Sequence, residues 1–519
     1  MSAIANHAHR AGRWWAPHAW LDGRWQDDVL LVSDSGGRWA TVQAGVPCPP
    51  DAQTLAGPVL PGLVNAHSHA FQRAFAGLSE RREHAGDDFW SWRDRMYRVA
   101  GAVTPDDVQA IAAHLYRELL AGGYTHVCEF HYLQHQPDGT PHADPLAMSH
   151  ALKAAAEDAG IGLTLLPVLY ERAGFTQPAL REDQRRFHLD ADGVWRAHQA
   201  LAAQSHATFN AGVAVHSLRA AAPASIHRLA HLARGMDGPV HLHVAEQTAE
   251  VEDCLTATGR RPIEWLAAEG LLDPRWQLVH ATHTVPAEID AVARAGSAAV
   301  ICPSTEANLG DGLADLPGWL DAGVGLAIGS DSHVTRCWPE ELRWMEYGQR
   351  LLHRKRNVAA APDRGQPATA ARLWQLALDA GGRAAGQAAW GLRVRSAGGP
   401  AGDRHGGRRA GRRARRSPAG CAGVQQPGAA VAGGDGRRAL GRAGPSRTQH
   451  RPDLSPIRRR DEPALAEQIG PEKRRLRPAG RRRRLKASSV KGRWRLWSHS
   501  TENGHPHAGD QWFEAEAAP

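Results

Sequence analysis

Short apolar runs alternate with longer amphipathic stretches along most of the chain. Each short run ends in a polar or ionisable residue, and eight of them occur, at residues 58–69, 125–132, 162–171, 211–217, 239–246, 277–283, 298–304 and 324–332. The stretches between them carry Ala and Leu at helical spacing, as in residues 105–122, 145–160, 226–234, 249–269 and 287–295. Eight strand and helix units in alternation predict an α/β fold, and a (β/α)8 TIM-like barrel over a doubly wound sheet.

A different pattern precedes these units. Residues 15–45 form short alternating runs separated by Gly turns, which is typical of antiparallel strands in a small β domain. We therefore expect three regions: N-terminal strands of a small β domain in residues 1–60, the barrel in residues 61–392, and a tail of different composition in residues 393–519.

The tail is strongly basic, whereas residues 1–392 are net acidic, so the formal charge of +8 hides a division of the chain. An acidic body repels phosphate, which excludes a uniformly cationic nucleic-acid surface for it. Arg, Gly, Ala and Pro dominate residues 393–489, with no apolar period that could bury a face. Taken alone, this composition predicts disorder.

Three interpretations of the tail compete. It is a basic arm for RNA or acidic partners, a solvated linker, or the translation of a GC-rich gene in a shifted frame, since GC-rich codons encode Arg, Gly, Ala and Pro. We favour the shifted frame because the composition changes abruptly after residue 392. A shifted frame should carry no evolved binding surface, so we assign the tail no function.

Nothing in the sequence indicates a membrane or secreted protein. No apolar run approaches the roughly 18 residues of a membrane span, and the N-terminal residues lack the apolar stretch of a signal peptide. The six cysteines are far apart and form no CxxC pair, so neither a thiolate zinc site nor a disulfide framework is indicated. We expect a cytoplasmic protein with reduced thiols.

Histidine and acidic residues gather at the ends of the predicted strands. The first strand ends in His67 and His69, and residues i and i+2 of a strand point to one side, so both imidazoles can face one ion. Barrel active sites lie at the C-terminal strand ends, where other strands should bring further side chains. These are His243, Glu246, His280 and Asp331. For residues 304–306 and 308–313, after the seventh strand, we expect a loop over the pocket that serves as a plain connection more than as a specific contact.

Three imidazoles and one carboxylate suit one zinc ion, which accepts N and O ligands and keeps a position for water. The predicted ligands are His67, His69, His243 and Asp331. Water on such an ion has a lowered pKa and is the expected nucleophile near neutral pH. Glu246 is placed to move a proton to a leaving nitrogen, and His280 to polarise the substrate or to support the ligands.

These motifs resemble the amidohydrolase superfamily, a family of metal-dependent hydrolases, in its mononuclear deaminase branch. PGLVNAHSH at the first strand, HxxE at the fifth, His at the sixth and GSDSH at the eighth carry the resemblance, which covers about residues 15–392. Within that branch the runs HSHAFQRA, FWSWR and EFHY resemble the formimidoylglutamate deiminases. Such enzymes of histidine degradation hydrolyse a formimino group to a formyl group and release ammonia.

The resemblance implies a role for each matching residue. Proton handling falls to Glu246, His280 and Asp331, and zinc binding to the four ligands already named. Five residues match positions that contact the substrate: Gln72, Arg93, Tyr132, His216 and Arg219. The two arginines suit the two carboxylates of N-formimidoyl-L-glutamate, because each guanidinium can bind one carboxylate through two hydrogen bonds. The fourth strand offers no obvious bridging Lys or Glu, which favours one ion.

Other functions stay open at this point. The enzymatic alternative is another mononuclear amidohydrolase, acting on a purine, pterin or triazine ring. Outside enzymes, the tail could make the chain an RNA-binding protein, and a pseudoenzyme that serves only assembly is a third alternative. We expect a small-molecule substrate, with no nucleic acid and no membrane as partner. Related enzymes pair as dimers, so a homodimer is also open.

The sequence departs from the family at its C-terminal end. Such enzymes usually finish with further β segments that complete the small domain, and nothing similar follows Gly391 and Leu392. If the tail is read in a shifted frame, the N-terminal strands lose their partners and leave unpaired edges. We therefore predict that the chain folds poorly or loses its small domain, with reduced activity.

Overall fold

The computed structural model describes residues 12–34, 37–82, 86–387, 389–393 and 431–432. All of them belong to one compact unit. Residues 394–430 and 433–519 lie outside the described part, and the interpretations of the tail fall on them. In the part of the chain that is described, no helix is long and apolar enough to span a membrane.

The first sheet holds the N-terminal strands, in the order β15-β5-β1-β2-β3, with β4 beside β1. Their bounds are Gly12–Leu21 (β1), Arg24–Ser33 (β2), Trp39–Gln43 (β3), Gln53–Thr54 (β4), Val59–Leu60 (β5) and Val431–Ala432 (β15). Asp22 and Gly23 join β1 to β2 as a two-residue turn with φ of 47° and 83°. An Asp-Gly pair favours this turn because both positions need positive φ. The predicted antiparallel strands are confirmed.

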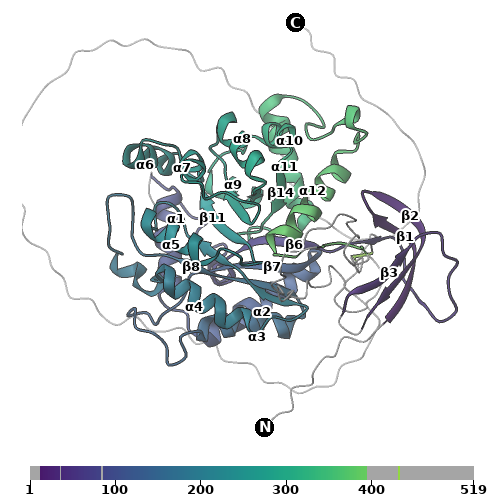
Figure 1. The fold of residues 1–519 in the computed structure, drawn as a ribbon, viewed down its shortest axis with the longest axis horizontal. Helices are drawn as coiled ribbons and strands as arrows, with labels where there is room; N and C mark the ends of the chain where they lie inside the picture. The colour runs from purple at the N-terminus through teal and green to yellow at the C-terminus, as the bar shows by residue number, and fades with distance from the viewer. Residues whose placement is uncertain (1–11, 35–36, 83–85, 388, 394–430, 433–519) are drawn as a thin grey trace, which may run out of the picture. The chain divides into compact units, whose positions relative to one another are not determined.

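The second sheet is the barrel, in the order β14-β13-β12-β11-β10-β8-β7-β6, with β9 beside β8 (Figure 1). Its strands are Leu63–Ser68 (β6), Tyr124–His131 (β7), Gly162–Leu169 (β8), Phe209–Ala211 (β9), Val213–Val215 (β10), Val240–Val244 (β11), Trp276–His280 (β12), Ala298–Ile301 (β13) and Gly325–Ile328 (β14). Neighbouring barrel strands run parallel, and a parallel bridge between Ser68 and Asp331 joins the first strand to the last. The predicted (β/α)8 barrel is confirmed.

One predicted strand, residues 58–69, is wrong in its extent. It consists of two strands in two sheets, because β5 pairs with β1 and β15, whereas β6 pairs with β7. The apolar pattern runs through both strands, but Pro61 and Gly62 interrupt it. Gly62 packs so closely on Thr125 that a Cβ there would lie 2.2 Å from the Thr125 side chain, so the chain can turn between the sheets only with glycine.

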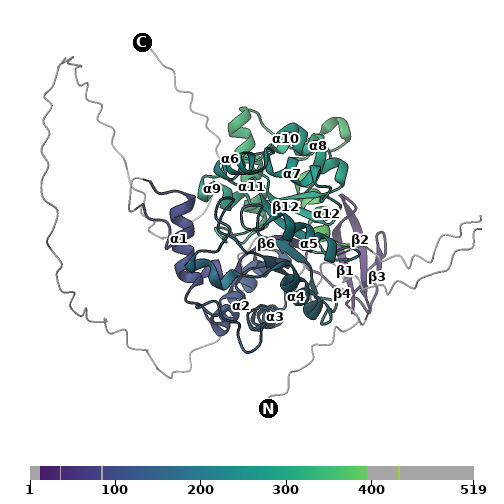
Figure 2. The ribbon, with the colours of Figure 1, turned by 60° about the vertical axis from the view of Figure 1, so that its left-hand side comes forward.

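Helices surround the barrel strands in both views (Figures 1 and 2). The α-helices are Phe89–Ala100 (α1), Pro105–Ala121 (α2), Ala147–Ala159 (α3), Ala191–Ala202 (α4), Pro223–Leu232 (α5), Thr248–Thr258 (α6), Pro262–Ala268 (α7), Pro286–Ala295 (α8), Pro303–Leu309 (α9), Leu316–Asp321 (α10), Trp338–His353 (α11) and Thr369–Ala384 (α12). The described residues also form the short 3-10 helices Ala70–Phe75 (η1), Glu182–Phe187 (η2) and Pro362–Arg364 (η3).

The predicted helical stretch 249–269 is two helices, α6 and α7. Gly259 ends α6 with φ of 73°, and Pro262 begins α7. Gly tolerates the left-handed conformation at a helix end, and Pro suits the first helical turn, so both residues mark a break that the Ala and Leu spacing hides. The barrel strands are buried along their whole length except at isolated positions such as Gly325. The polar groups of the site stand at their C-terminal ends.

Candidate metal and active site

Three imidazoles and one carboxylate converge where β6, β11 and β14 end. The Nε2 atom of His67 lies 3.1 Å from Nε2 of His69 and 2.9 Å from Nε2 of His243. The Oδ1 atom of Asp331 lies 3.4 Å from Nε2 of His67 and 3.2 Å from Nε2 of His69. The structure therefore gathers the four residues predicted as metal ligands around His67, whose donor atom groups with those of His69 and Asp331 on one side and with those of His243 and His280 on the other.

The charge state of these histidines fits a metal ion. Burial lowers the pKa of His67, His69 and His243, and the neighbouring imidazoles lower those of His67 and His243 further. Neutral imidazoles present lone pairs, and three nitrogens with one carboxylate oxygen are a donor set that a borderline divalent cation accepts. A cation among them also relieves the close approach of the Nε2 atoms.

The remaining ring nitrogens fix how two of these imidazoles are turned. His69 donates from Nδ1 to the carbonyl of Phe130 at 3.0 Å, and His243 donates from Nδ1 to the carbonyl of His216 at 2.9 Å. Each bond leaves Nε2 without a proton and aimed at the common point. The Nδ1 atom of His67 is buried without a hydrogen-bond partner in the described part of the chain.

The junction of the first and last barrel strands lies at this cluster. The Asp331 amide donates to the carbonyl of His67 at 3.0 Å, and the His69 amide donates to the carbonyl of Asp331 at 3.3 Å. Asn65 supports the junction, because its Oδ1 accepts from the Ser330 amide at 2.8 Å and its Nδ2 donates to Ser330 Oγ at 2.7 Å. Only glycine fits at position 329, since a Cβ atom there would lie 2.6 Å from the Cβ of His67.

Left-handed backbone recurs at the strand ends that carry the site. The φ angles are 53° at Ala245, 68° at His280 and 46° at Asp331, and none of these residues is glycine. Such a conformation costs roughly 1–2 kcal/mol at each residue, and it persists only where the surrounding structure holds it. At these three positions the left-handed conformation turns the chain sharply, so that side chains next to one another in sequence can both face the site.

His280 and Glu246 stand beside the cluster. The Nε2 atom of His280 lies 3.6 Å from Oε1 of Glu246 and 3.8 Å from Oδ2 of Asp331. Burial raises the pKa of Glu246 to about 7. Burial alone would lower the pKa of His280, but the carboxylates of Glu246, Glu306 and Asp331 outweigh it and raise that pKa to about 10. One carboxyl can thus exchange a proton near neutral pH beside a cationic imidazole.

Glu306 is a site residue that the sequence interpretation missed. Its Oε1 accepts from Nδ1 of His280 at 3.3 Å and from the Cys302 amide at 2.8 Å. The expected loop over residues 304–313 is wrong at its start, because Pro303–Leu309 forms the helix α9 and its first turn is buried. An acidic residue five positions beyond the end of the buried strand β13 was the available signal.

Asp311 lies farther along the same connection. One of its oxygens accepts from the side chain of Gln247, and the other is buried without a partner in the described part of the chain. Burial and the charge of Glu246 raise the pKa of Asp311 to about 9. The loop is held in place by His283, whose Nε2 donates to the carbonyl of Asp311 at 2.9 Å.

Aromatic and amide side chains from the predicted substrate positions form a wall beside the histidines. Gln72 donates from Nε2 to the Tyr132 hydroxyl at 3.2 Å, while its Oε1 is buried without a partner in the described residues. The Tyr132 ring lies 5.1 Å from that of His69, and the His216 ring lies 5.2 Å from that of His243. The structure thus places Gln72, Tyr132 and His216 next to the cluster.

The two predicted substrate arginines meet at one indole. The Cζ atom of Arg93 lies 4.5 Å from the ring centre of Trp90, and the Cζ atom of Arg219 lies 5.4 Å from it. Both arginines are half-buried. Among the described residues, no Asp or Glu forms an ion pair with either guanidinium within 4.0 Å. The sequence interpretation assigned no role to Trp90, which the FWSWR run contains.

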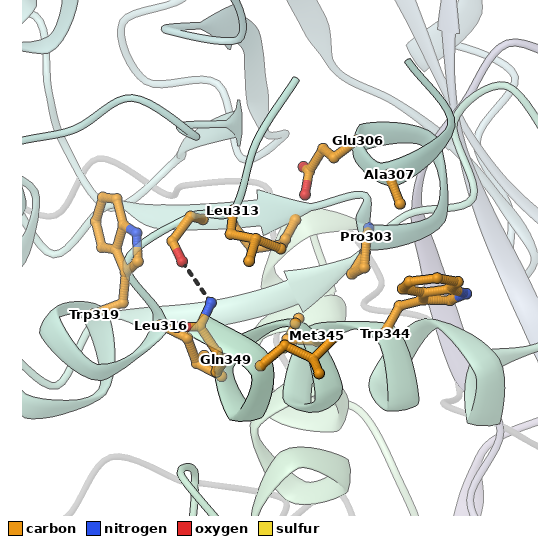
Figure 3. A pocket seen from close by; sticks show the side chains of 13 residues that line it. Pro303, Glu306, Ala307, Leu313, Leu316, Trp319, Trp344, Met345 and Gln349 are labelled. Carbon is orange, nitrogen blue, oxygen red and sulfur yellow. Dashed lines mark hydrogen bonds between the residues drawn. The ribbon is translucent and has the colours of Figure 1, made fainter. Parts of the chain in front are cut away.

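A separate apolar cavity of about 190 Å³ lies between α9, α10 and α11 (Figure 3). Trp319, Trp344 and Met345 are among its lining side chains, and Glu306 stands at its edge. Gln349 donates to the carbonyl of Ala314 at 2.8 Å across it. Its apolar lining suits no charged amino-acid substrate, so the histidine cluster is the chemically equipped site.

Comparison with known proteins agrees with this geometry. A formimidoylglutamate deiminase of Pseudomonas aeruginosa is 46% identical over 381 residues, which are 73% of this chain and 83% of that protein. The crystal structure of an amidohydrolase from Brucella melitensis superposes with a TM-score of 0.69 at 42% identity, covering 74% of this chain and 84% of that one.

A more distant structure shows the fold alone. An adenosine deaminase from Xanthomonas campestris, solved with bound zinc, superposes with a TM-score of 0.57 at 23% identity, over 72% of this chain and 80% of that chain. The model of the amidohydrolase family matches residues 59–371, a range that contains all four predicted metal ligands. With its barrel, its clustered donors and these relatives, the chain belongs to the amidohydrolase family, whose members are metal-dependent hydrolases.

Proposed function

We propose that the protein hydrolyses N-formimidoyl-L-glutamate to N-formyl-L-glutamate and ammonia, in the cytoplasm, as a step of histidine degradation. The observation that carries the proposal is a pair of arginines without carboxylate partners among the described residues, beside a buried metal-type donor cluster. A substrate with two carboxylates and a hydrolysable C–N group matches both parts. The 46% identity with a formimidoylglutamate deiminase supports the same substrate.

One zinc ion would be held by His67, His69, His243 and Asp331, whose donor atoms already converge. Zinc at such a site acts as a Lewis acid and makes water acidic enough to serve as a nucleophile near neutral pH. The zinc bound to the adenosine deaminase of the same fold supports this choice of metal.

Proton transfer would fall to the carboxylates and to His280. The reaction adds water to the formimino carbon and expels ammonia, so one proton must leave the water and another must reach the departing nitrogen. A carboxyl with a pKa of about 7 can do both, which suits Glu246. Asp331 is a second acceptor, and the cationic imidazole of His280 can donate a hydrogen bond to the oxygen on which negative charge develops.

Substrate orientation would come from the other side of the site. Arg93 and Arg219 each bind one carboxylate, and Gln72, Tyr132 and His216 line the path from there to the reacting carbon. A purine, pterin or triazine ring would leave both guanidinium charges uncompensated, so the geometry favours the amino-acid substrate over these alternatives.

The test is ammonia release from N-formimidoyl-L-glutamate by the zinc-loaded protein, measured beside guanine. We expect turnover of the first substrate only, and its loss in His280→Ala. Zinc content and circular dichroism of the variant must match the original protein, so that lost turnover reports chemistry. A folded, zinc-loaded protein that leaves this substrate intact would overturn the proposal, and release of ammonia from guanine would favour the purine alternative.

A further inference from the structure

Trp90 joins the two arginines of the proposed substrate site. Trp90, Arg93 and Tyr97 are spaced by three and four residues and therefore share one face of α1. Arg219 comes from another part of the barrel, the connection after β10. The indole is in cation–π distance of both guanidiniums, at 4.5 Å and 5.4 Å from their Cζ atoms.

This arrangement gathers two positive charges at one indole, and neither guanidinium forms an ion pair with a carboxylate within 4.0 Å among the described residues. The Nε atom of Arg93 is buried and has no hydrogen-bond partner among the described residues. Burial lowers the pKa of His216, and the charges of Arg219 and Arg93 lower it further, so both guanidiniums act on the same end of the site. An aromatic face attracts cations but carries no net charge, so two anions can still bind there.

The spacing suits two carboxylates on one short chain. The two Cζ atoms lie 4.5 Å and 5.4 Å from the centre of the same indole ring, so they can be at most about 10 Å apart. An extended glutamyl group separates its two carboxylate carbons by about 5 Å, from ordinary bond lengths and angles. A guanidinium can therefore lie at each end of such a group, at the distance of a charge-assisted hydrogen bond.

We propose that Trp90 is a positioning residue that determines specificity: its indole holds Arg93 and Arg219 at the separation that binds the two carboxylates of a glutamyl substrate together. The inference rests on the proposed deiminase function for the identity of the substrate. Binding of a dicarboxylate can be measured without turnover, so the two proposals fail separately.

The binding test compares glutarate, which has two carboxylates, with butyrate. Butyrate is glutarate with one carboxylate replaced by a hydrogen atom. Calorimetric titration of the zinc-loaded protein is expected to show tighter binding of glutarate. Trp90→Leu should weaken glutarate binding by about 10-fold, the value of one or two lost cation–π contacts, and should change butyrate binding by less than about 3-fold. Trp90→Phe, which keeps an aromatic face, should restore part of the glutarate affinity.

The matched control is Trp92→Leu. Trp92 lies on the same helix and packs its ring on Phe75 and Phe89, at 5.5 Å and 6.0 Å between ring centres. No guanidinium lies over it among the described residues. This variant removes an equal ring from α1 and should leave the preference for glutarate intact.

Kinetics supply the second measurement. Trp90→Leu should raise KM for N-formimidoyl-L-glutamate by about 10-fold and leave kcat within about 3-fold, because the indole touches no reacting atom. Unchanged glutarate affinity in Trp90→Leu would overturn the inference, as would an original protein that does not prefer glutarate to butyrate. If Trp90→Leu does not fold, an unchanged affinity in Trp90→Phe overturns it in the same way. A protein that prefers glutarate but releases no ammonia would instead overturn the deiminase function.

Discussion

The contact between Glu306 and His280 yields the sharpest prediction. Both side chains are buried, and Oε1 of Glu306 accepts from Nδ1 of His280 at 3.3 Å. That bond places the proton on Nδ1 and turns Nε2 toward Glu246 and Asp331. Removing Glu306 should therefore change the reaction without removing any group that touches the substrate.

The magnitude follows from the distance. Two unit charges 3.3 Å apart interact by about 5 kcal/mol at an effective dielectric constant of about 20, whereas a neutral hydrogen bond contributes only about 1 kcal/mol. Glu306→Gln keeps an acceptor for Nδ1 and loses the charge, and Glu306→Ala loses both. We expect kcat to fall by about 10- to 100-fold in the glutamine variant and further in the alanine variant.

The assay is steady-state ammonia release from N-formimidoyl-L-glutamate at saturating zinc, with KM and kcat measured separately. KM should stay within about 3-fold, since Glu306 contacts His280 at Nδ1, whereas Nε2 is the atom that faces Glu246 and Asp331. Zinc content measured on the same samples distinguishes a lost orientation from a lost metal. A Glu306→Ala variant that binds zinc and keeps the full kcat would refute this reasoning.

Three further predictions follow from other parts of the structure. Chelation should abolish activity and lower the melting temperature, because an ion that binds only the folded chain stabilises it. Elemental analysis should find about one zinc per chain in the original protein and less in His243→Ala. Full activity of the metal-free protein would contradict a role of the histidine cluster in metal binding. Arg219→Lys should lower kcat/KM for N-formimidoyl-L-glutamate by about 30-fold, because a lysine cannot bind a carboxylate through two parallel hydrogen bonds. The control Arg196→Lys, on α4, should leave kcat/KM unchanged. Equal values in the two variants would contradict the assignment of Arg219 to substrate binding. Burial raises the pKa of Glu341 to about 8, although it accepts from Ser304, so its contribution to stability is full below its unfolded pKa of about 4.5 and is lost as the pH rises through about 8. Chemical unfolding of the metal-free protein at pH 5 and at pH 8.5 should therefore show that the original chain loses up to about 4 kcal/mol of stability relative to Glu341→Gln. An equal pH dependence of the two proteins would contradict this prediction.

The sequence predicted the metal-type cluster because the barrel fixes where strand ends meet. His67, His69, His243 and Asp331 each follow an apolar run, and a parallel barrel brings the ends of such runs to one face whatever the helices do. The alternation of strands and helices along the chain and the N-terminal antiparallel strands could also be predicted, because both depend on short periodic patterns in the sequence. Roles in catalysis and substrate binding remain predictions.

Glu306 and Trp90 could not be found in that way. Neither lies at a strand end: Glu306 is in the first turn of α9, and Trp90 is near the start of α1. Their contacts depend on how a helix packs on the barrel, which no local period encodes. The division of residues 58–69 into β5 and β6 was missed because sheet membership depends on the partner strand, and the partners are distant in sequence.

The bridge between Ser68 and Asp331 has a consequence for how the protein matures during synthesis. Two of the ligand residues leave the ribosome with β6, and Asp331 follows only after every other barrel strand has been made. The nascent chain therefore lacks part of the predicted ligand set for most of its translation, and closing this long loop is expected to be slow and entropically costly. If these residues bind the proposed zinc ion, metal capture and ring closure would be coupled, and metal supply during translation should then affect the yield of native protein as well as its activity.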